Sequence, residues 1–103
     1  MAVHTTVVFT DLAGSTGLFE SLGNEKATEA VTRLNRWIGE VIEAHEGRVV
    51  KNLGDGVLGT FADATDAMFA ALEIQRAHHI RLARWPAALR TEIKIGLAHG
   101  DVV

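Results

Sequence analysis

The sequence contains no cysteine and only one proline in 103 residues. The lack of cysteine excludes disulfide frameworks, thiolate zinc sites and cysteine nucleophiles. No apolar run is long enough to cross a bilayer, and the amino terminus lacks the pattern of a secretory signal. Basic residues are fewer than acidic ones, 10 against 13, which argues against a general nucleic-acid binder. We therefore expect a cytoplasmic domain, without nucleic-acid or membrane contacts, that forms one unit over residues 1–103.

The residues that are present form alternating strand and helix patterns. Runs rich in β-branched and aromatic residues predict four strands, at residues 4–10, 48–53, 57–61 and 91–98. A long helix is predicted to begin at an Asn24 cap and to end at Gly47. Its apolar stripe recurs at spacings of three and four residues and comprises Ala27, Ala30, Val31, Leu34, Trp37, Ile38, Val41 and Ile42.

Two more helices are predicted around these elements. A polar turn over residues 11–16 is expected to precede a short helix over residues 17–22. Asp63 is expected to cap a second long helix that runs to about residue 84, where Trp85-Pro86 would break it.

The carboxyl-terminal part of the sequence adds two smaller expectations. Gly100-Asp101 is predicted as a turn, after which Val102-Val103 would begin another strand. His78 and His79 are neighbours on the second long helix, and neighbouring side chains point about 100° apart. We therefore expect the two histidines on a partly exposed helix surface and not as a metal-binding pair.

The order of elements, βαββαβ, predicts an α+β fold. It is that of a ferredoxin-like sandwich, an antiparallel sheet with two main helices on one face. Right-handed crossover places the third strand between the first two. The end of the first strand and the start of the third then lie side by side. Asp11 and Asp55 occupy these two points, so the topology brings two carboxylates together.

Two adjacent carboxylates repel each other unless a cation neutralises them. Mg²⁺ prefers oxygen ligands and often binds one or two carboxylates together with substrate phosphates. The backbone N–H groups from Ala13 to Thr16 open a helix and suit an anion. Together these features predict phosphoryl or nucleotidyl chemistry. The plainer interpretation is that Asp11 caps a helix and Asp55 is a hairpin turn residue.

Other patterns fit less well. Gly54, Gly56 and Gly59 match the spacing of a dinucleotide-binding fingerprint, which requires a helix to start inside the motif, whereas a strand is predicted there. A diguanylate cyclase or polymerase palm shares the expected topology, but its Gly-Gly-Asp/Glu-Glu-Phe signature is absent from the hairpin.

Three segments resemble the class III adenylyl and guanylyl cyclases. Residues 9–16 (FTDLAGST) are similar to the first metal motif of that family, and residues 51–57 (KNLGDGV) to the second. Residues 95–102 (IGLAHGDV) are similar to the strand and turn that follow. The resemblance therefore extends over almost the whole sequence in the family's order.

The resemblance implies functional roles for residues of the first two motifs. Asp11 and Asp55 would hold two Mg²⁺ or Mn²⁺ ions, joined by the backbone carbonyl of Leu12. The amides of Ala13, Gly14, Ser15 and Thr16 would hold the β- and γ-phosphates. The 3′-hydroxyl of the ribose would then attack the α-phosphorus of the substrate and release pyrophosphate.

Lys51 matches the position that reads the base in this family. Adenine N1 accepts a hydrogen bond and lysine can only donate one, so Lys51 favours ATP over GTP. The implied product is cyclic AMP. The family's site lies between two subunits, so a head-to-tail homodimer is expected, in which Lys51 serves the site opposite to its own Asp55.

The family pattern also continues beyond the matched segments. A further hairpin and helix carry a second base-reading residue, a ribose-orienting asparagine and an arginine that stabilises the transition state, without counterparts in residues 1–103. We therefore expect the front portion of a cyclase catalytic domain, whose exposed sheet edge would also permit a swapped or non-native dimer. The alternative is a catalytically incomplete module that binds nucleotide and metal or dimerises.

Overall fold

The computed structural model describes residues 3–52, 54–84 and 91–102. The elements in chain order are β1 (Val3–Ala13), α1 (Ser15–Leu22), α2 (Asn24–Ala44), β2 (Arg48–Asn52), β3 (Val57–Phe61), α3 (Ala64–Leu82) and β4 (Glu92–Val102). The sheet has the order β2-β3-β1-β4, and each neighbouring pair is antiparallel. The predicted α+β, ferredoxin-like arrangement is confirmed, with α1 added after β1.

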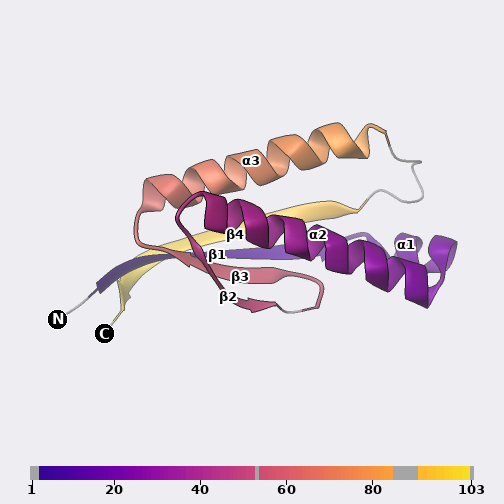
Figure 1. Ribbon diagram of the computed structural model, residues 1–103, viewed down its shortest axis with the longest axis horizontal. Coiled ribbons are helices and arrows are strands. Elements are labelled where there is room, and N and C mark those ends of the chain that lie inside the picture. The colour runs from indigo at the N-terminus through magenta and orange to yellow at the C-terminus, as the bar shows by residue number, and fades with distance from the viewer. Residues whose placement is uncertain (1–2, 53, 85–90, 103) are drawn as a thin grey trace.

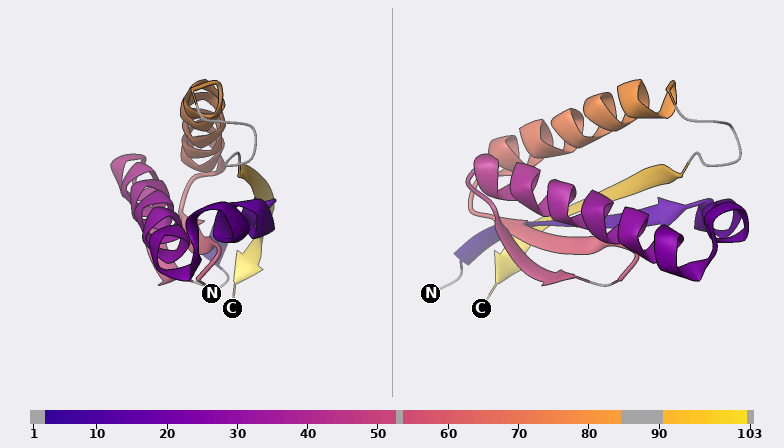
Figure 2. Two further views of the ribbon diagram at one scale, coloured as in Figure 1. Left: turned by 90° about the vertical axis from the view of Figure 1, so that its right-hand side faces the viewer. Right: turned by 45° about the vertical axis from the view of Figure 1, so that its right-hand side comes forward.

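Helices α2 and α3 cover one face of the sheet (Figures 1 and 2). Helix α2 packs on β2 and β3, and α3 packs on β1, β3 and β4. The buried face of α2 matches the predicted apolar stripe, except that it also includes Asn35, whereas Ala30 and Trp37 are half-buried at its margin. The core lies between the helices and the sheet, and its largest fully buried apolar side chains are Phe61, Ile38, Ile42 and Ile74.

The first strand is longer than predicted. Residues 11–13 were expected in a turn, but β1 continues through them to Ala13 because each pairs with a residue of β4. Helix α1 therefore begins at Ser15, two residues before the predicted start. Asp11 and Leu12 thus sit on a fixed strand and not in a loop.

Both predicted ends of α2 need correction. Asn24 does not cap the helix: it is the first helical residue, and Gly23 precedes it without a side-chain hydrogen bond. The helix ends at Ala44, before Gly47. Glu46 takes the left-handed conformation there, with φ 67°. The N–H of Gly47 donates to the carbonyl of Ile42 at 2.9 Å, and that of Glu46 to the carbonyl of Glu43 at 3.2 Å, which is a Schellman ending.

The last strand also continues where a turn was predicted. Gly100 pairs with Thr5 and Asp101 with His4, so both lie within β4, and Val102 ends this strand instead of starting another. The long ladder with β1 satisfies backbone groups that a turn would have left exposed.

The predicted cap of α3 is confirmed, because Asp63 accepts a hydrogen bond from the Thr65 N–H at 2.8 Å. The helix ends at Leu82, slightly before the predicted residue 84. His78 contradicts its prediction: it is buried, and its Nε2 bonds the carbonyl of Thr91. His79 is exposed as expected.

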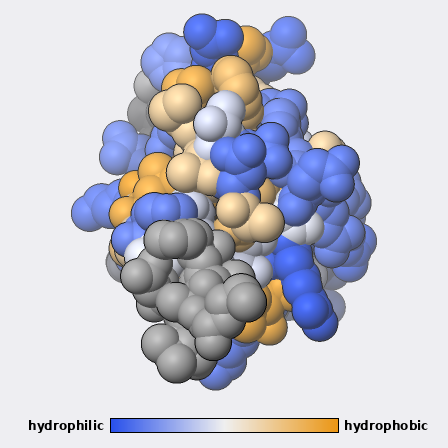
Figure 3. Space-filling view, turned by 90° about the vertical axis from the view of Figure 1, so that its left-hand side faces the viewer, coloured by the Kyte–Doolittle hydropathy of each residue, from blue (hydrophilic) through white to orange (hydrophobic). Residues whose placement is uncertain are grey.

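Several expectations fall on residues outside the described ranges, namely the helix stop at Trp85-Pro86, the end of the second strand at Leu53, and Val103. None of the helices in the described ranges is both long and apolar enough to cross a membrane. Figure 3 shows the end of the molecule that carries both termini, where hydrophilic and hydrophobic side chains are interspersed.

Candidate active site

The backbone segments that carry Asp11 and Asp55 are hydrogen-bonded to each other. The N–H of Leu12 donates to the carbonyl of Asp55 at 3.0 Å. The β1–β3 register, in which Phe9 is the partner of Leu58, continues toward this bond. Both aspartates are exposed. The predicted juxtaposition of the two aspartate positions, at the end of β1 and just before the start of β3, is therefore present.

The hairpin segment that carries Asp55 is fixed to β1 by two further features. The buried hydroxyl of Thr10 accepts a hydrogen bond from the Val57 N–H at 2.9 Å. Gly56 lies so close to β1 that an added Cβ would be 2.0 Å from the carbonyl oxygen of Thr10. Only glycine allows this approach. Thr10 and Gly56 thus set the spacing between the two strands beside the aspartates.

The open face of the sheet is the face that presents Asp11. Along β1, Thr6, Val8, Thr10 and Leu12 are buried, whereas Phe9 and Asp11 are exposed. Side chains alternate between the faces of a strand, so the buried set faces the helices and Asp11 faces away from them. The Leu12 side chain is thus part of the core, and only its backbone is near the site.

Lys94 is a residue that the motif comparison missed. It is the direct partner of Asp11 in the β1–β4 ladder, and its side chain is exposed. Directly opposed residues share a face of the sheet, so a cation stands beside the carboxylate. The signal was present in the sequence, because Ile93, Lys94 and Ile95 alternate in polarity, but register was needed to place Lys94.

Lys51 lies on the same face but farther across the sheet. It pairs with Leu58 of β3, which in turn pairs with Phe9 of β1. Its side chain is exposed on the outer strand β2. The interval from β2 to β1 is two strand spacings, or roughly 10 Å. Lys51 is therefore not an immediate neighbour of Asp11 within one chain.

The expected phosphate loop is a short junction between β1 and α1. Ala13 ends the strand, and Gly14 precedes the helix in the left-handed conformation, with φ 80°. Ser15 and Thr16 are the first helical residues, and no side chain caps this helix end. The first N–H groups of α1 are thus left without a side-chain partner, in a position that follows Asp11 by a few residues.

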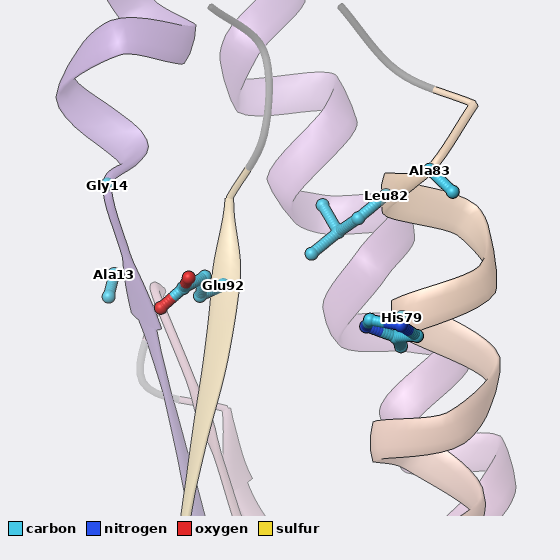
Figure 4. Close-up of a pocket in the computed structure, with 6 residues that line it drawn as sticks. All are labelled: Ala13, Gly14, His79, Leu82, Ala83 and Glu92. Carbon is cyan, nitrogen blue, oxygen red and sulfur yellow. The ribbon is translucent and has the colours of Figure 1, made fainter. Parts of the chain in front are cut away.

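A cavity of about 620 Å³ lies beside this junction. It is lined by Ala13, Gly14 and Glu92 at one side and, at the other, by His79 and Leu82 of α3 and by Ala83, which follows the helix (Figure 4). Glu92 is the ladder partner of Ala13. Neither Asp11 nor Asp55 lines the cavity, so it is adjacent to the candidate site and not its centre.

The donor set suits a hard divalent cation. Asp11 and Asp55 offer carboxylate oxygens and Leu12 offers a backbone carbonyl, and Mg²⁺ and Mn²⁺ bind such oxygens. Within residues 3–52, 54–84 and 91–102, no group of three or more histidine, aspartate or glutamate side chains forms a metal cluster. A metal bound by Asp11 and Asp55 would therefore need further ligands, which substrate phosphates supply in sites of this kind.

Comparison with known proteins relates this geometry to one enzyme class. The sequence is 33% identical to an adenylate cyclase of Streptomyces coelicolor over 97 residues, 93% of this chain and 24% of that protein. It is 32% identical to the putative adenylate cyclase 3 of Rhizobium meliloti over 101 residues, 94% of this chain and 16% of that protein. No family model matches the sequence.

Solved structures with a similar fold are also described as nucleotide cyclases. The adenylate/guanylate cyclase/hydrolase of Silicibacter pomeroyi superposes with a TM-score of 0.81 at 31% identity, over all of this chain and 59% of that one. The chain belongs to the class III nucleotide cyclase family. The guanylyl cyclase Cya2 has the same fold, with a TM-score of 0.77 at 24% identity over 98% of this chain and 56% of that one. This cyclase-family chain spans about a quarter or less of the first two curated relatives.

The fold also excludes one alternative interpretation of the glycine-containing hairpin. The dinucleotide-binding fingerprint requires a helix after Gly54 and Gly56, but the cyclase-family domain continues there as strand β3. That interpretation is excluded.

Proposed function

We propose that this domain converts ATP to 3′,5′-cyclic AMP and pyrophosphate. The observation that carries the proposal is the backbone hydrogen bond between Leu12 and Asp55, which brings the positions of Asp11 and Asp55 together in a nucleotide cyclase fold. In the reaction a bond forms between the ribose 3′-oxygen and the α-phosphorus. The bond from that phosphorus to the β-phosphate oxygen breaks, and the 3′-hydroxyl loses its proton.

Two divalent ions, Mg²⁺ or Mn²⁺, are the proposed cofactors, held by Asp11, Asp55 and the carbonyl of Leu12. When bound, such ions neutralise charge on the triphosphate and polarise the reacting oxygens. The exposure of both carboxylates supports this role, because substrate phosphates need access to complete the coordination.

The protein's own groups would orient the triphosphate around these aspartates. Lys94 supplies a positive charge next to Asp11, where charge-assisted hydrogen bonds to phosphate oxygens are available. The uncapped N–H groups at Ser15 and Thr16, together with the backbone of Ala13 and Gly14, would bind the terminal phosphates.

The active form is proposed to be a head-to-tail homodimer. The family resemblance implies a base-reading lysine on the subunit opposite to the metal-binding aspartates, and Lys51 lies two strands from Asp11 within one chain. The lysine at the base is therefore proposed to come from a second chain. The open face also exposes Phe9, which is 47% accessible and offers an apolar contact surface. Adenine specificity follows from Lys51, since a lysine can donate to N1 of adenine but cannot accept from N1–H of guanine.

The test is cyclic-nucleotide formation by the purified chain with Mn²⁺ and either ATP or GTP, over a range of protein concentrations. We expect cyclic AMP at a low rate, because the family's transition-state arginine has no counterpart in residues 1–103, and we expect this rate to rise faster than linearly with protein. Asp55→Asn and Asp11→Asn should each lower the rate about 100-fold or more, whereas the exposed Glu29→Gln should leave it unchanged. Binding of Mn²⁺ and ATP without product would instead support the non-catalytic module.

A separate variant tests the base. Lys51→Glu replaces a donor with an acceptor, so it should lower the ratio of cyclic AMP to cyclic GMP. An unchanged ratio would show that Lys51 does not read the base. Mixing Lys51→Glu with Asp55→Asn tests the dimer, because head-to-tail pairing leaves one site with both native residues.

A further inference from the structure

A buried asparagine lies beneath the hairpin that carries Asp55. Asn35 is on the sheet-facing side of α2 and is only 2% exposed. Its Nδ2 donates to the carbonyl of Gly54, the residue before Asp55, at 2.6 Å. The helix layer thus makes a direct hydrogen bond to the segment that presents a candidate metal ligand.

The position is costly for a polar side chain. On α2, Asn35 occupies the buried stripe that otherwise consists of apolar residues, with Leu34 before it and Ile38 one turn later. Its Oδ1 is buried and has no hydrogen-bond partner among the residues that the structure describes. A buried unsatisfied carbonyl is destabilising, so packing alone would favour leucine here.

The hydrogen bond completes a set of contacts that fix the Asp55 segment. Asp55 itself accepts from the Leu12 N–H on β1, and Gly54 also donates its N–H to the Asn52 side chain at 3.1 Å. The contacts from β1 and from within the hairpin set its position in the plane of the sheet. Asn35 approaches from the helix layer, so its hydrogen bond is suited to set the distance between the Asp55 segment and the helices.

We propose that Asn35 is a positioning residue for the metal site: its amide holds Gly54 so that the Asp55 carboxylate meets a divalent ion together with Asp11. This inference rests on the proposed function for the ion itself. It assigns no direct contact with metal or nucleotide to Asn35. The buried amide is retained at a cost in stability because it adds a contact from the helix layer to those that β1 makes with the Asp55 segment.

The proposal predicts that stability and metal affinity change in opposite directions. Asn35→Leu removes the donor and the buried carbonyl, while exposed Gly54 regains water as its partner. The thermal midpoint should stay equal or rise. The dissociation constant for Mn²⁺ alone, measured by electron paramagnetic resonance, should rise about tenfold. Val41→Ala, a cavity-forming change farther along the same helix face, should lower the midpoint without changing the Mn²⁺ constant.

A second readout needs no metal. The Leu12 amide bonds Asp55, so its hydrogen exchange in the metal-free chain reports opening of the hairpin. We expect faster exchange at Leu12 in Asn35→Leu, with no faster exchange at the buried Ile74 of α3. If Asn35→Leu does not fold, Asn35→Ser, which is too short to reach Gly54, serves the same comparison.

The outcomes separate this inference from the proposed function. Unchanged Mn²⁺ affinity and unchanged exchange in Asn35→Leu would overturn the positioning role, as would an equal loss of affinity in Val41→Ala. If the unsubstituted chain binds no Mn²⁺ either alone or with ATP present, the proposed metal site is wrong. The exchange rate at Leu12 then still decides whether Asn35 holds the hairpin.

Discussion

Asp11 and Lys94 are direct partners across the β1–β4 ladder, and both side chains are exposed on the face of the sheet opposite to α2 and α3. An aspartate beside a lysine is usually interpreted as a surface ion pair, which contributes little to stability. Here the lysine adjoins a proposed metal ligand, so its charge is available to a bound triphosphate.

Lys94→Gln tests this role. Loss of a charge-assisted hydrogen bond to phosphate costs about 1.5–3 kcal/mol, so KM for ATP should rise roughly tenfold to a hundredfold. The thermal midpoint should change little, because the side chain is exposed. Steady-state kinetics with Mn²⁺ would measure the effect, and Lys26→Gln, on the exposed part of α2, is the matched control. A KM equal to that of the control would remove Lys94 from the site.

Gly56 is predicted to tolerate no side chain. A Cβ there would lie 2.0 Å from the backbone oxygen of Thr10, which cannot move without breaking the β1–β3 ladder. Gly56→Ala should therefore destabilise the protein by about 2 kcal/mol or more and abolish Mn²⁺ binding. Urea unfolding and Mn²⁺ titration would measure both effects.

Gly100→Ala is the control for this substitution, because an added Cβ at residue 100 meets no atom within 4 Å. It should leave stability within about 0.5 kcal/mol of the original. Equal losses in the two variants would mean that glycine is needed in these strands for a reason other than space.

The topology and the proximity of the Asp11 and Asp55 positions could be predicted from the sequence because both depend on patterns of apolar and β-branched residues that extend over whole elements. The apolar stripe of α2 and the β-branched runs survive small errors in where each element ends. Chain crossover rules then allow few arrangements. The proximity of two aspartate positions that are distant in the sequence could therefore be predicted without coordinates.

Details that depend on one neighbour could not be predicted in this way. Gly100 and Asp101 have turn propensity, but the partner strand β1 keeps them extended. Asn35 and His78 are polar, so a search for apolar periodicity passes over them, although both occupy buried helix positions. Their hydrogen bonds to Gly54 and Thr91 come from other elements, and only the fold brings these partners close.

Glu46 is predicted to destabilise the folded protein relative to glycine at this position. It holds the left-handed conformation that ends α2, with φ 67°, where glycine is strongly preferred. Glu46→Gly should stabilise the protein by about 0.5–1 kcal/mol. Glu43→Gly, within the last turn of α2, should instead destabilise it by up to about 1 kcal/mol. Chemical denaturation of both variants gives the comparison, and a loss of stability in Glu46→Gly would contradict the assignment of the helix end.

His78 should make stability depend on pH. Burial lowers the pKa of His78 below its ordinary value of 6.5, a nearby Arg81 acts in the same direction, and the hydrogen bond to the Thr91 carbonyl opposes them. The folded state therefore binds a proton less readily than the unfolded chain. The contribution of His78 is fully present above pH 6.5 and is lost as the pH falls toward the lower folded pKa, at a slope of at most about 1.4 kcal/mol per pH unit.

Urea unfolding between pH 7.5 and about pH 5 would measure this loss. In His78→Gln the side chain retains an N–H donor but no longer titrates, so the free energy of unfolding should fall less steeply with decreasing pH. The adjacent His79→Gln is the matched control, because it replaces an exposed histidine on the same helix. If both variants give the slope of the unsubstituted chain, the pH dependence comes from other groups, and protonation of His78 does not weaken the contact between α3 and the start of β4.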